Sequence, residues 1–387
     1  MTGDTYCRGG SAADASDRQP SPPTKGPVER ARRTFLKRTA AGAVAGTSLL
    51  SGCLGPMSSD ESEGQPTTGT ETSGTPDSTG DDPKVGVYLG DESALAPWEE
   101  WFGRPVDYYS FNVPTGGWEE YLVDNMPFER PIEPIASDRE IAVTMKMFPP
   151  GETTLAAVAA GDHADRHETF ARSLIRHGMA DATVRIGHEM NGRWSPDGAV
   201  GHPDRFVRAW RRVVEAMNAA DGAAFEYVWA PHVGRVHMDP TAAYPGDEWV
   251  DQVGLTVYDK SQHYYPPGCG DACVQRLREE NWNRLVNQDF GLSHWVEFAR
   301  DREKPLVFPE YGVAARNWND AGSGDNPLFF ERFADWIGAN SDVVAWHNVW
   351  SFVAGPHFVG PSELHVSEQY ESLPEASRTF KTVFNSE

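Results

Sequence analysis

The sequence is short of positive charge. Its 387 residues carry 34 Lys and Arg against 57 Asp and Glu, a net charge of −23 with a pI near 4.9. A protein that binds nucleic acid needs a basic surface, so this composition argues against a nucleic-acid partner. Aromatic residues nevertheless reach 11%. That fraction is too high for an acidic disordered chain, and it indicates a large core or a groove whose aromatic rings stack on a ligand.

Cysteine is also scarce, with four residues in the whole chain. Cys269 and Cys273 lie four positions apart beside Pro and Gly, a spacing that favours a local disulfide in an oxidising compartment. The alternative is a metal site, for which only His263 and Asp271 are local additional ligands. We therefore expect a Cys269–Cys273 disulfide, no bound metal and no cofactor.

The first 53 residues form a basic segment unlike the rest of the chain. Eight Lys or Arg stand against four acidic residues, which leaves −27 for the remainder. The run Arg32-Arg33-Thr34-Phe35-Leu36-Lys37 resembles a twin-arginine export signal, and residues 39–50 are too few and too rich in Ala and Gly to span a bilayer. Because Leu50-Ser51-Gly52-Cys53 resembles a lipoprotein processing box, we expect lipid attachment at Cys53 and a membrane anchor.

Residues 54–83 are expected to be a disordered acidic linker. They are dominated by Ser, Thr, Gly, Pro, Asp and Glu and contain no basic residue, so they cannot form a packed core. The predicted order is a signal segment (1–53), this linker and a catalytic domain (84–387). The signal predicts export to the outer face of the cell membrane or secretion, and the dense carboxylates suit a halophilic setting.

Eight apolar or β-branched runs alternate with helical stretches after residue 84. Amphipathic helices are expected at 165–177 and 203–219, the second with proline at its start. This alternation predicts a (β/α)8 TIM barrel of the α/β class. A doubly wound sheet is the alternative, disfavoured because no Gly-rich phosphate loop is present. The expected strands are 84–89, 106–113, 141–148, 183–187, 225–230, 252–258, 305–308 and 343–350.

Two glutamates lie at the ends of predicted strands. Glu189 follows the fourth strand and Glu310 follows the seventh, each close to glycine. The carboxyl ends of TIM-barrel strands carry the chemistry, and these two strands lie across the mouth from each other. Glycoside hydrolysis needs one carboxylic acid that protonates the leaving oxygen and one carboxylate that attacks the sugar or activates water. Glu189 and Glu310 are therefore the expected catalytic pair.

The motifs around both glutamates resemble glycoside hydrolase family 26. His188-Glu189-Met190-Asn191-Gly192-Arg193-Trp194 is similar to the family's fourth-strand motif, and Pro309-Glu310-Tyr311-Gly312 to its nucleophile strand. The segment 249–259 is similar to the family's sixth-strand segment. The best-known family members are retaining endo-β-1,4-mannanases with a (β/α)8 fold.

The resemblance implies a role for each motif residue. Glu189 is the implied acid/base and Glu310 the nucleophile, which Tyr258 hydrogen-bonds. His188 and Trp194 are implied to bind substrate near the point of cleavage. Arg185, on the fourth strand, is a further candidate because a neighbouring cation keeps a carboxylate ionised.

Aromatic residues at other strand ends suit a sugar groove, because the C–H faces of sugar rings stack on aromatic rings. Trp229 and Trp350 are therefore expected to bind substrate, with His232 as a hydrogen-bonding partner. Further candidates of the same kind are Trp118, Trp346 and Asn348. Indoles on helical segments are expected in the core, namely Trp210, Trp282, Trp295 and Trp336.

The chain departs from the family pattern in ways that bear on substrate choice. Ser195-Pro196-Asp197-Gly198 replaces further aromatic residues after Trp194, Thr256 replaces an Asp, and residues 146–150 occupy the region of a substrate-binding His. We expect a monomer that cleaves a β-linked polysaccharide internally and with retention, β-1,4-mannan first. The alternatives are a β-glucanase or β-1,3-xylanase of the same family and a non-catalytic carbohydrate-binding lipoprotein.

Overall fold

A computed structural model describes residues 82–128, 131–259, 265, 268–318 and 322–385. The expected signal segment (1–53), its Cys53 and all but the last two residues of the expected linker (54–83) lie outside these residues. The first strand begins at Lys84, where the catalytic domain is expected to begin.

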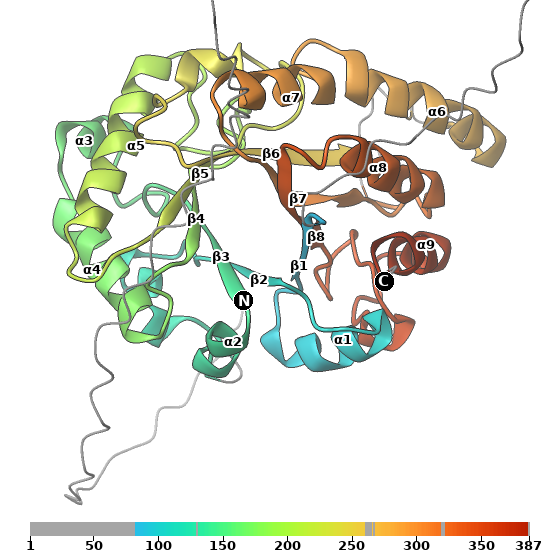
Figure 1. The fold of residues 1–387 in the computed structure, drawn as a ribbon, viewed down its shortest axis with the longest axis horizontal. Coiled ribbons are helices and arrows are strands. Elements are labelled where there is room, and N and C mark those ends of the chain that lie inside the picture. The colour runs from blue at the N-terminus through green and yellow to red at the C-terminus, as the bar shows by residue number, and fades with distance from the viewer. Residues whose placement is uncertain (1–81, 129–130, 260–264, 266–267, 319–321, 386–387) are drawn as a thin grey trace, which may run out of the picture. The chain divides into compact units, whose positions relative to one another are not determined.

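Eight parallel strands close into a barrel, which confirms the predicted fold (Figure 1). Each strand pairs with the next, and β8 returns to β1, where Tyr88 and Trp350 are in register. Because all the strands are parallel, their carboxyl ends share one rim, the rim that carries the chemistry in TIM barrels. The strands are β1 (Lys84–Tyr88), β2 (Tyr108–Asn112), β3 (Glu140–Met145), β4 (Thr183–Ile186), β5 (Glu226–Trp229), β6 (Gln252–Asp259), β7 (Leu306–Val313) and β8 (Val344–Trp350).

Helices follow the strands and surround the barrel (Figure 1). The two amphipathic helices expected from the sequence are confirmed as α4 and α5. Prolines begin α5, α8 and α9, where the missing N–H would have no helical partner. The helices are α1 (Leu95–Phe102), α2 (Glu133–Asp138), α3 (Leu155–Ala160), α4 (Ala164–Arg176), α5 (Pro203–Asn218), α6 (Asp271–Asn287), α7 (Leu292–Asp301), α8 (Pro327–Ala339) and α9 (Pro374–Phe384). Short 3-10 turns lie at Glu92–Ala94, Trp118–Tyr121, Val123–Asn125, Pro240–Ala243 and Ser362–Leu364.

The apolar interior of the described residues consists of one large core and smaller separate clusters. A small cluster includes Tyr108 and Trp346, whose ring centroids stack 4.6 Å apart, and Trp346 Nε1 donates to Gln252 Oε1 at 2.8 Å. Trp346 is 2% exposed, so the expectation that it lines a sugar groove is wrong. A larger core contains the helical indoles as expected, with Trp210 and Trp295 fully buried and Trp282 and Trp336 partly buried against it.

The seventh strand is longer than the sequence predicts. An end at Phe308 is expected because Pro309 lacks the N–H that a strand ladder needs. Instead, β7 continues to Val313, and its pairing with β6 and β8 shifts register around the proline. The shift accommodates the proline without ending the strand, so Glu310 lies within β7 rather than after it.

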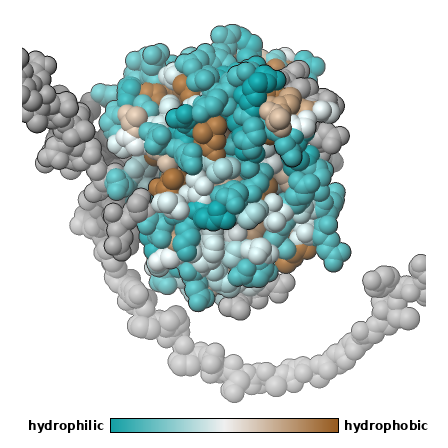
Figure 2. Space-filling view, turned by 90° about the vertical axis from the view of Figure 1, so that its right-hand side faces the viewer, coloured by the Kyte–Doolittle hydropathy of each residue, from teal (hydrophilic) through white to brown (hydrophobic). Residues whose placement is uncertain are grey.

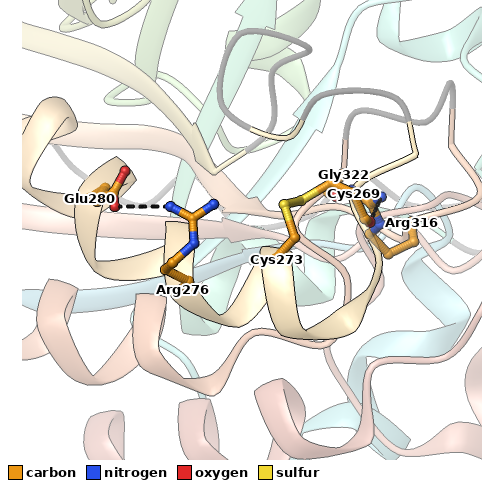
Figure 3. Close-up of a disulfide and its surroundings, with 6 residues drawn as sticks. All are labelled: Cys269, Cys273, Arg276, Glu280, Arg316 and Gly322. Atoms are coloured by element: carbon orange, nitrogen blue, oxygen red, sulfur yellow. Dashed lines mark hydrogen bonds and ion pairs between the residues drawn. A yellow bond between two sulfur atoms is a disulfide. The ribbon is translucent and has the colours of Figure 1, made fainter.

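The disulfide expected between Cys269 and Cys273 is present at the start of α6 (Figure 3). Arg316, from the segment that follows β7, donates to the carbonyl oxygens of Cys269 at 2.9 Å and Gly322 at 3.0 Å. These bonds connect the disulfide to the segment after β7. No cluster of three or more potential metal ligands occurs in the described part of the chain.

The surface is largely polar. The face shown in Figure 2 is mostly hydrophilic, with scattered apolar side chains between the polar ones. Among the described residues, Trp194 is the large aromatic that stands out, with 54% of its surface exposed. In the ranges that the structure describes, no helix has the length and apolar character needed to cross a bilayer.

Acid should destabilise the fold through buried histidines. Burial lowers the pKa of His347 to about 3, and Arg104 adds to the shift. The unfolded chain takes up a proton at this residue below about pH 6.5 and the folded chain does not, so the free energy of unfolding falls as the pH drops through that window. For one histidine the loss is about 2 kcal/mol between pH 7 and pH 5.

The variant His347→Gln tests this, because Gln retains a polar partner for the Tyr311 hydroxyl, which lies 2.8 Å from His347 Nδ1. Urea unfolding at the two pH values should show a smaller loss for the variant, by about 2 kcal/mol. Equal losses in both proteins contradict the prediction.

Candidate active site

The rim at the carboxyl ends of the strands brings the two predicted glutamates together around Tyr258. Tyr258, near the end of β6, donates its hydroxyl to Glu310 Oε1 at 2.9 Å. Burial raises the pKa of Tyr258 well above its usual value, and the charges of Glu310 and Glu189 raise it further. Both carboxylates are therefore within electrostatic reach of one phenol, which keeps its proton and acts as a donor.

Glu310 is held from a second side by Arg185. Arg185 Nη1 lies 2.6 Å from Glu310 Oε2, and the two side chains are 2% and 12% exposed. Arg185 Nη2 donates to the Thr256 hydroxyl. The strands β4, β6 and β7 thus each contribute to this contact, and Arg185 and Tyr258 fix the orientation of the Glu310 carboxylate.

Glu189 lies in an unusual backbone conformation. Its φ is 54°, in the left-handed region that few residues other than glycine adopt. Its N–H donates to the carbonyl oxygen of Ala230 at 2.9 Å, and its Oε2 accepts a hydrogen bond from Trp194 Nε1 at 2.6 Å. Strain of this kind persists where surrounding contacts impose it and is common at functional sites.

Asn191 fixes the loop that carries Glu189 and Trp194. Its side chain is buried, and its Nδ2 donates to the carbonyl oxygens of His232 at 2.9 Å and Gly234 at 3.0 Å. Its Oδ1 accepts from the N–H of His232 at 2.9 Å. Three hydrogen bonds of one side chain therefore connect the loops after β4 and β5. The His232 ring lies edge-on to Trp194, with centroids 6.1 Å apart.

His188 is a neutral imidazole near Glu189 and Arg185. Burial lowers the pKa of His188 to about 3, and the charges of Arg185 and Lys146 lower it further against the opposing effect of Glu189. Its Nδ1 is buried and has no hydrogen-bond partner among the described residues. A neutral ring can either donate to a sugar hydroxyl or accept from one.

A polar network that the sequence does not predict lies beside His188. Lys146, just after β3, donates from Nζ to the Ser195 hydroxyl at 2.7 Å, and that hydroxyl bonds Asp197. Asp197 is buried and also accepts from the N–H of Met147 at 3.0 Å. The sequence marks these positions as departures from the family pattern, but contact between the two segments appears only in three dimensions.

Aromatic rings form part of the rim near Glu310. Trp350, predicted to bind substrate, is half-buried and stacks on Tyr88 with ring centroids 3.9 Å apart. Burial and the charge of Glu310 raise the pKa of Tyr88 to about 12, so Tyr88 lies near the nucleophile candidate. Its position at the end of the first predicted strand could have identified it. Two further rings near Tyr258 are not predicted from the sequence. The His357 ring lies 4.7 Å from the Tyr258 ring, and the Trp318 ring lies 5.4 Å from that of His357, measured between centroids.

The expected sugar contact of Trp229 is wrong, and Trp118 and Asn348 contact other groups of the protein. Trp229 is fully buried, donates to the carbonyl oxygen of Ala243 and packs on Trp295 from α7. It lies on the outer, helix-covered side of β5, because alternate residues of a strand face opposite sides. Trp118 packs against His167, with ring centroids 5.5 Å apart. Asn348 is buried and donates to the carbonyl oxygen of Pro309 at 3.1 Å, so it supports the nucleophile strand.

The arrangement has the parts of a two-carboxylate hydrolase. One carboxylate is held by a phenol and a guanidinium, and the other lies beside an indole N–H on a fixed loop. The first can attack a positively polarised carbon and the second can exchange a proton with a leaving oxygen.

Comparison with known families agrees with this chemistry. Residues 179–271 match the model of glycosyl hydrolase family 26. This family 26 segment runs from just before β4 to the start of α6, so it contains Glu189 and Tyr258. The matched segment is similar to this family in the region where the motif around Glu189 predicts the resemblance. Glu310 lies beyond the matched segment.

A curated relative and two solved structures are also similar. A mannan endo-1,4-beta-mannosidase of Bifidobacterium adolescentis is 26% identical over 226 residues, which cover 55% of this chain and 20% of that protein. The chain therefore spans about a fifth of the length of this curated relative. A double mutant of an endo-beta-1,4-mannanase from Cellulomonas fimi has a TM-score of 0.54 at 18% identity, with 77% of this chain and 70% of that chain covered. The catalytic domain of a family 26 endo-beta-1,4-mannanase from Bacillus sp. JAMB-750 has a TM-score of 0.55 at 14% identity, with 79% and 86% covered. The two structures support the barrel fold.

Glycine at position 192 should be needed to seat Trp194 against Glu189. A Cβ at this position would overlap the Trp194 ring, and Trp194 is exposed enough to move away. In Gly192→Ala the indole should therefore release Glu189 Oε2, and kcat/KM on a glycan substrate should fall about tenfold, the equivalent of one charge-assisted hydrogen bond.

A second variant, Trp194→Phe, retains a ring but lacks the N–H donor, so its kcat/KM should fall by a similar factor. The melting temperature should change little in either variant, since the indole is exposed. Unchanged kcat/KM in both variants contradicts the role of this bond.

Proposed function

We propose that the protein is a retaining endo-glycosidase that cleaves β-1,4-mannan. The observation that carries the proposal is the holding of Glu310 by Tyr258 and Arg185 beside a second glutamate at the barrel rim. A nucleophile must be held in one orientation toward the carbon that it attacks, and the two donors hold Glu310 in this way, which a binding protein does not need. This favours catalysis over carbohydrate binding alone.

In the first step of the proposed reaction, Glu310 attacks the anomeric carbon of the sugar. The bond from that carbon to the glycosidic oxygen breaks, and Glu189 transfers its proton to the departing oxygen. Tyr258 and Arg185 orient Glu310 for the attack. The product is a glycosyl ester on Glu310 and a free chain end.

In the second step a water molecule attacks the same carbon and displaces Glu310. Glu189, now ionised, removes the proton from that water and so returns to its acid form. Two displacements at one carbon restore the original configuration. In this proposal His188, Trp194 and His232 contact the sugars beside Glu189, and the stacked rings of Tyr88 and Trp350 contact those beside Glu310.

Mannan is the preferred substrate because the Bifidobacterium relative is named a mannan endo-1,4-beta-mannosidase. The Lys146–Ser195–Asp197 network lies where the family resemblance implies aromatic residues and a histidine. A different lining beside the scissile bond favours keeping a β-glucan or a β-1,3-xylan as a second candidate substrate.

We further propose that the chain is exported and held at the outer face of the cell membrane through a lipid on Cys53. The support is the twin-arginine run and the Leu50-Ser51-Gly52-Cys53 box in the sequence. The acidic composition favours a protein that works in high salt. We also propose that the protein is a monomer and that its partner is the polysaccharide substrate.

Hydrolysis should depend on the Glu310 carboxylate. Wild type should release reducing ends from mannan, and Glu310→Gln should lose at least about a thousandfold in kcat, because the neutral amide cannot attack. Glu226→Gln is the matched control: Glu226 lies at the start of β5, at the opposite end of the barrel, where it bonds Gln252.

The assay should include lichenan and β-1,3-xylan and cover low to molar salt. Proton NMR of the first product distinguishes retention from inversion. Failure to cleave any of the three glycans sinks the enzyme proposal, and full activity of Glu310→Gln sinks the assignment of the nucleophile.

Export and anchoring should depend on separate residues of the signal segment. In a host with a twin-arginine pathway, Cys53→Ser should shift the protein from the membrane fraction to the medium. The double change Arg32→Lys and Arg33→Lys should retain it in the cell. Membrane association that persists in Cys53→Ser contradicts the lipid anchor.

A further inference from the structure

A second hollow lies outside the barrel rim, between α1, α9 and the segment that follows β8. Figure 1 shows the two helices side by side, and the rings of Trp98 and Phe380 connect them with centroids 6.0 Å apart. The hollow has a volume of about 720 Å³, within the range of about 300–1,000 Å³ typical of ligand pockets. None of the candidate active-site residues lines it.

The walls of this pocket are fixed by buried hydrogen bonds. Trp98 Nε1, from α1, donates to the carbonyl oxygen of Val359 at 2.8 Å. The N–H of Gly360 donates to the Ser377 hydroxyl, from α9, at 3.1 Å. The segment after β8 is thus bonded to both helices, so the pocket is formed before any ligand arrives, which reduces the entropy cost of binding.

One wall of the pocket is an indole. Trp101, near the end of α1, is half-buried, and the Lys381 ammonium lies 5.8 Å from its ring centroid. The lysine is on a flexible stem and can move aside. A half-exposed indole in a hollow offers a flat apolar face of the kind on which the C–H face of a sugar ring stacks.

The remaining lining is polar and nearly neutral. Hydroxyls of Ser362, Ser372 and Thr382 and the amide of Asn385 supply both donors and acceptors. The charged lining groups are Arg378, Lys381 and Glu363, and Arg378 already pairs with Glu375. This chain has a net charge of −23, so a lining without excess negative charge is a local exception. It suits an uncharged ligand rich in hydroxyl groups better than an ion.

We propose that this pocket is a second glycan-binding site that holds a segment of β-linked polysaccharide while another segment occupies the barrel rim. The identity of the glycan rests on the proposed function, but the pocket does not. A second contact raises the effective concentration of the polymer at the rim. It therefore benefits long chains and leaves short ones, which reach only one site, unaffected.

The test compares Trp101→Ala with Trp249→Ala. Trp249 is a matched control, another half-buried indole with a cation over its ring, Arg211 at 5.5 Å, but it lines neither the pocket nor the rim. Trp101→Ala should raise KM for soluble mannan about three- to tenfold, the loss expected for one stacking contact. For a short manno-oligosaccharide kcat/KM should stay at the wild-type value. Trp249→Ala should change neither.

Binding is measured separately in the inactive Glu310→Gln background by retardation in gels that contain glucomannan. Trp101→Ala should reduce the retardation and Trp249→Ala should not. Thr382 is an exposed position on α9 that lines the pocket. The variant Thr382→Arg obstructs the hollow without removing the indole, so it should reduce the retardation as Trp101→Ala does. Circular dichroism checks the fold of both variants, and either one that is folded suffices for the test.

The outcomes separate the two proposals. If wild type cleaves no glycan but retardation depends on Trp101, the proposed function fails and the second site stands. If wild type cleaves mannan and Trp101→Ala matches Trp249→Ala in both KM and retardation, the second site is overturned.

Discussion

The contact of Arg185 and Tyr258 with Glu310 is the constraint on which the rest of the site depends. Removing two charged groups from water is unfavourable unless they bond each other well, and loss of one partner of such a buried pair costs about 3–5 kcal/mol. Here the pair is 2% and 12% exposed. Arg185, Tyr258 and Glu310 come from three different strands. Closure of the barrel therefore brings the contact into existence, and the contact in turn fixes where the nucleophile candidate points.

Around this fixed centre the loops after β4 and β5 hold the second carboxylate. Glu189 adopts a left-handed backbone conformation, which is unfavourable for a residue with a side chain. The buried Asn191 offsets this through three hydrogen bonds to the neighbouring loop. The hydrogen bonds between the loops thus stabilise the unfavourable backbone conformation of Glu189 at the barrel rim. The neighbouring His188 stays neutral because burial and two nearby cations oppose its protonation.

Much of the site follows from local patterns in the sequence. The strand positions, the two glutamates and the roles expected of Tyr258 and Arg185 toward Glu310 agree with the observed contacts. The expected roles of Trp229 and Trp346 are wrong for different reasons. Trp229 lies on the helix-covered face of β5, whereas Trp346 lies inside the barrel near the amino end of β8. A strand pattern shows neither the face that a residue occupies nor its depth. Tyr88 has a local signal in the sequence, its place at the end of a predicted strand. The Lys146–Ser195–Asp197 network has none, because it joins segments far apart in the chain that meet only at the rim.

The sequence by itself determined the order of strands and helices, the pair of carboxylates, the local disulfide and the shortage of positive charge. These depend on spacing, residue type and composition, which are readable within a few dozen residues. Only the tertiary structure decided which side chains face the rim, that β7 passes through Pro309, and that α1 and α9 enclose a hollow beside Trp101. Those features depend on the closure of eight strands and on the register between them. A shift of one residue in the register of a strand moves each side chain from the interior of the barrel to its helix-covered side.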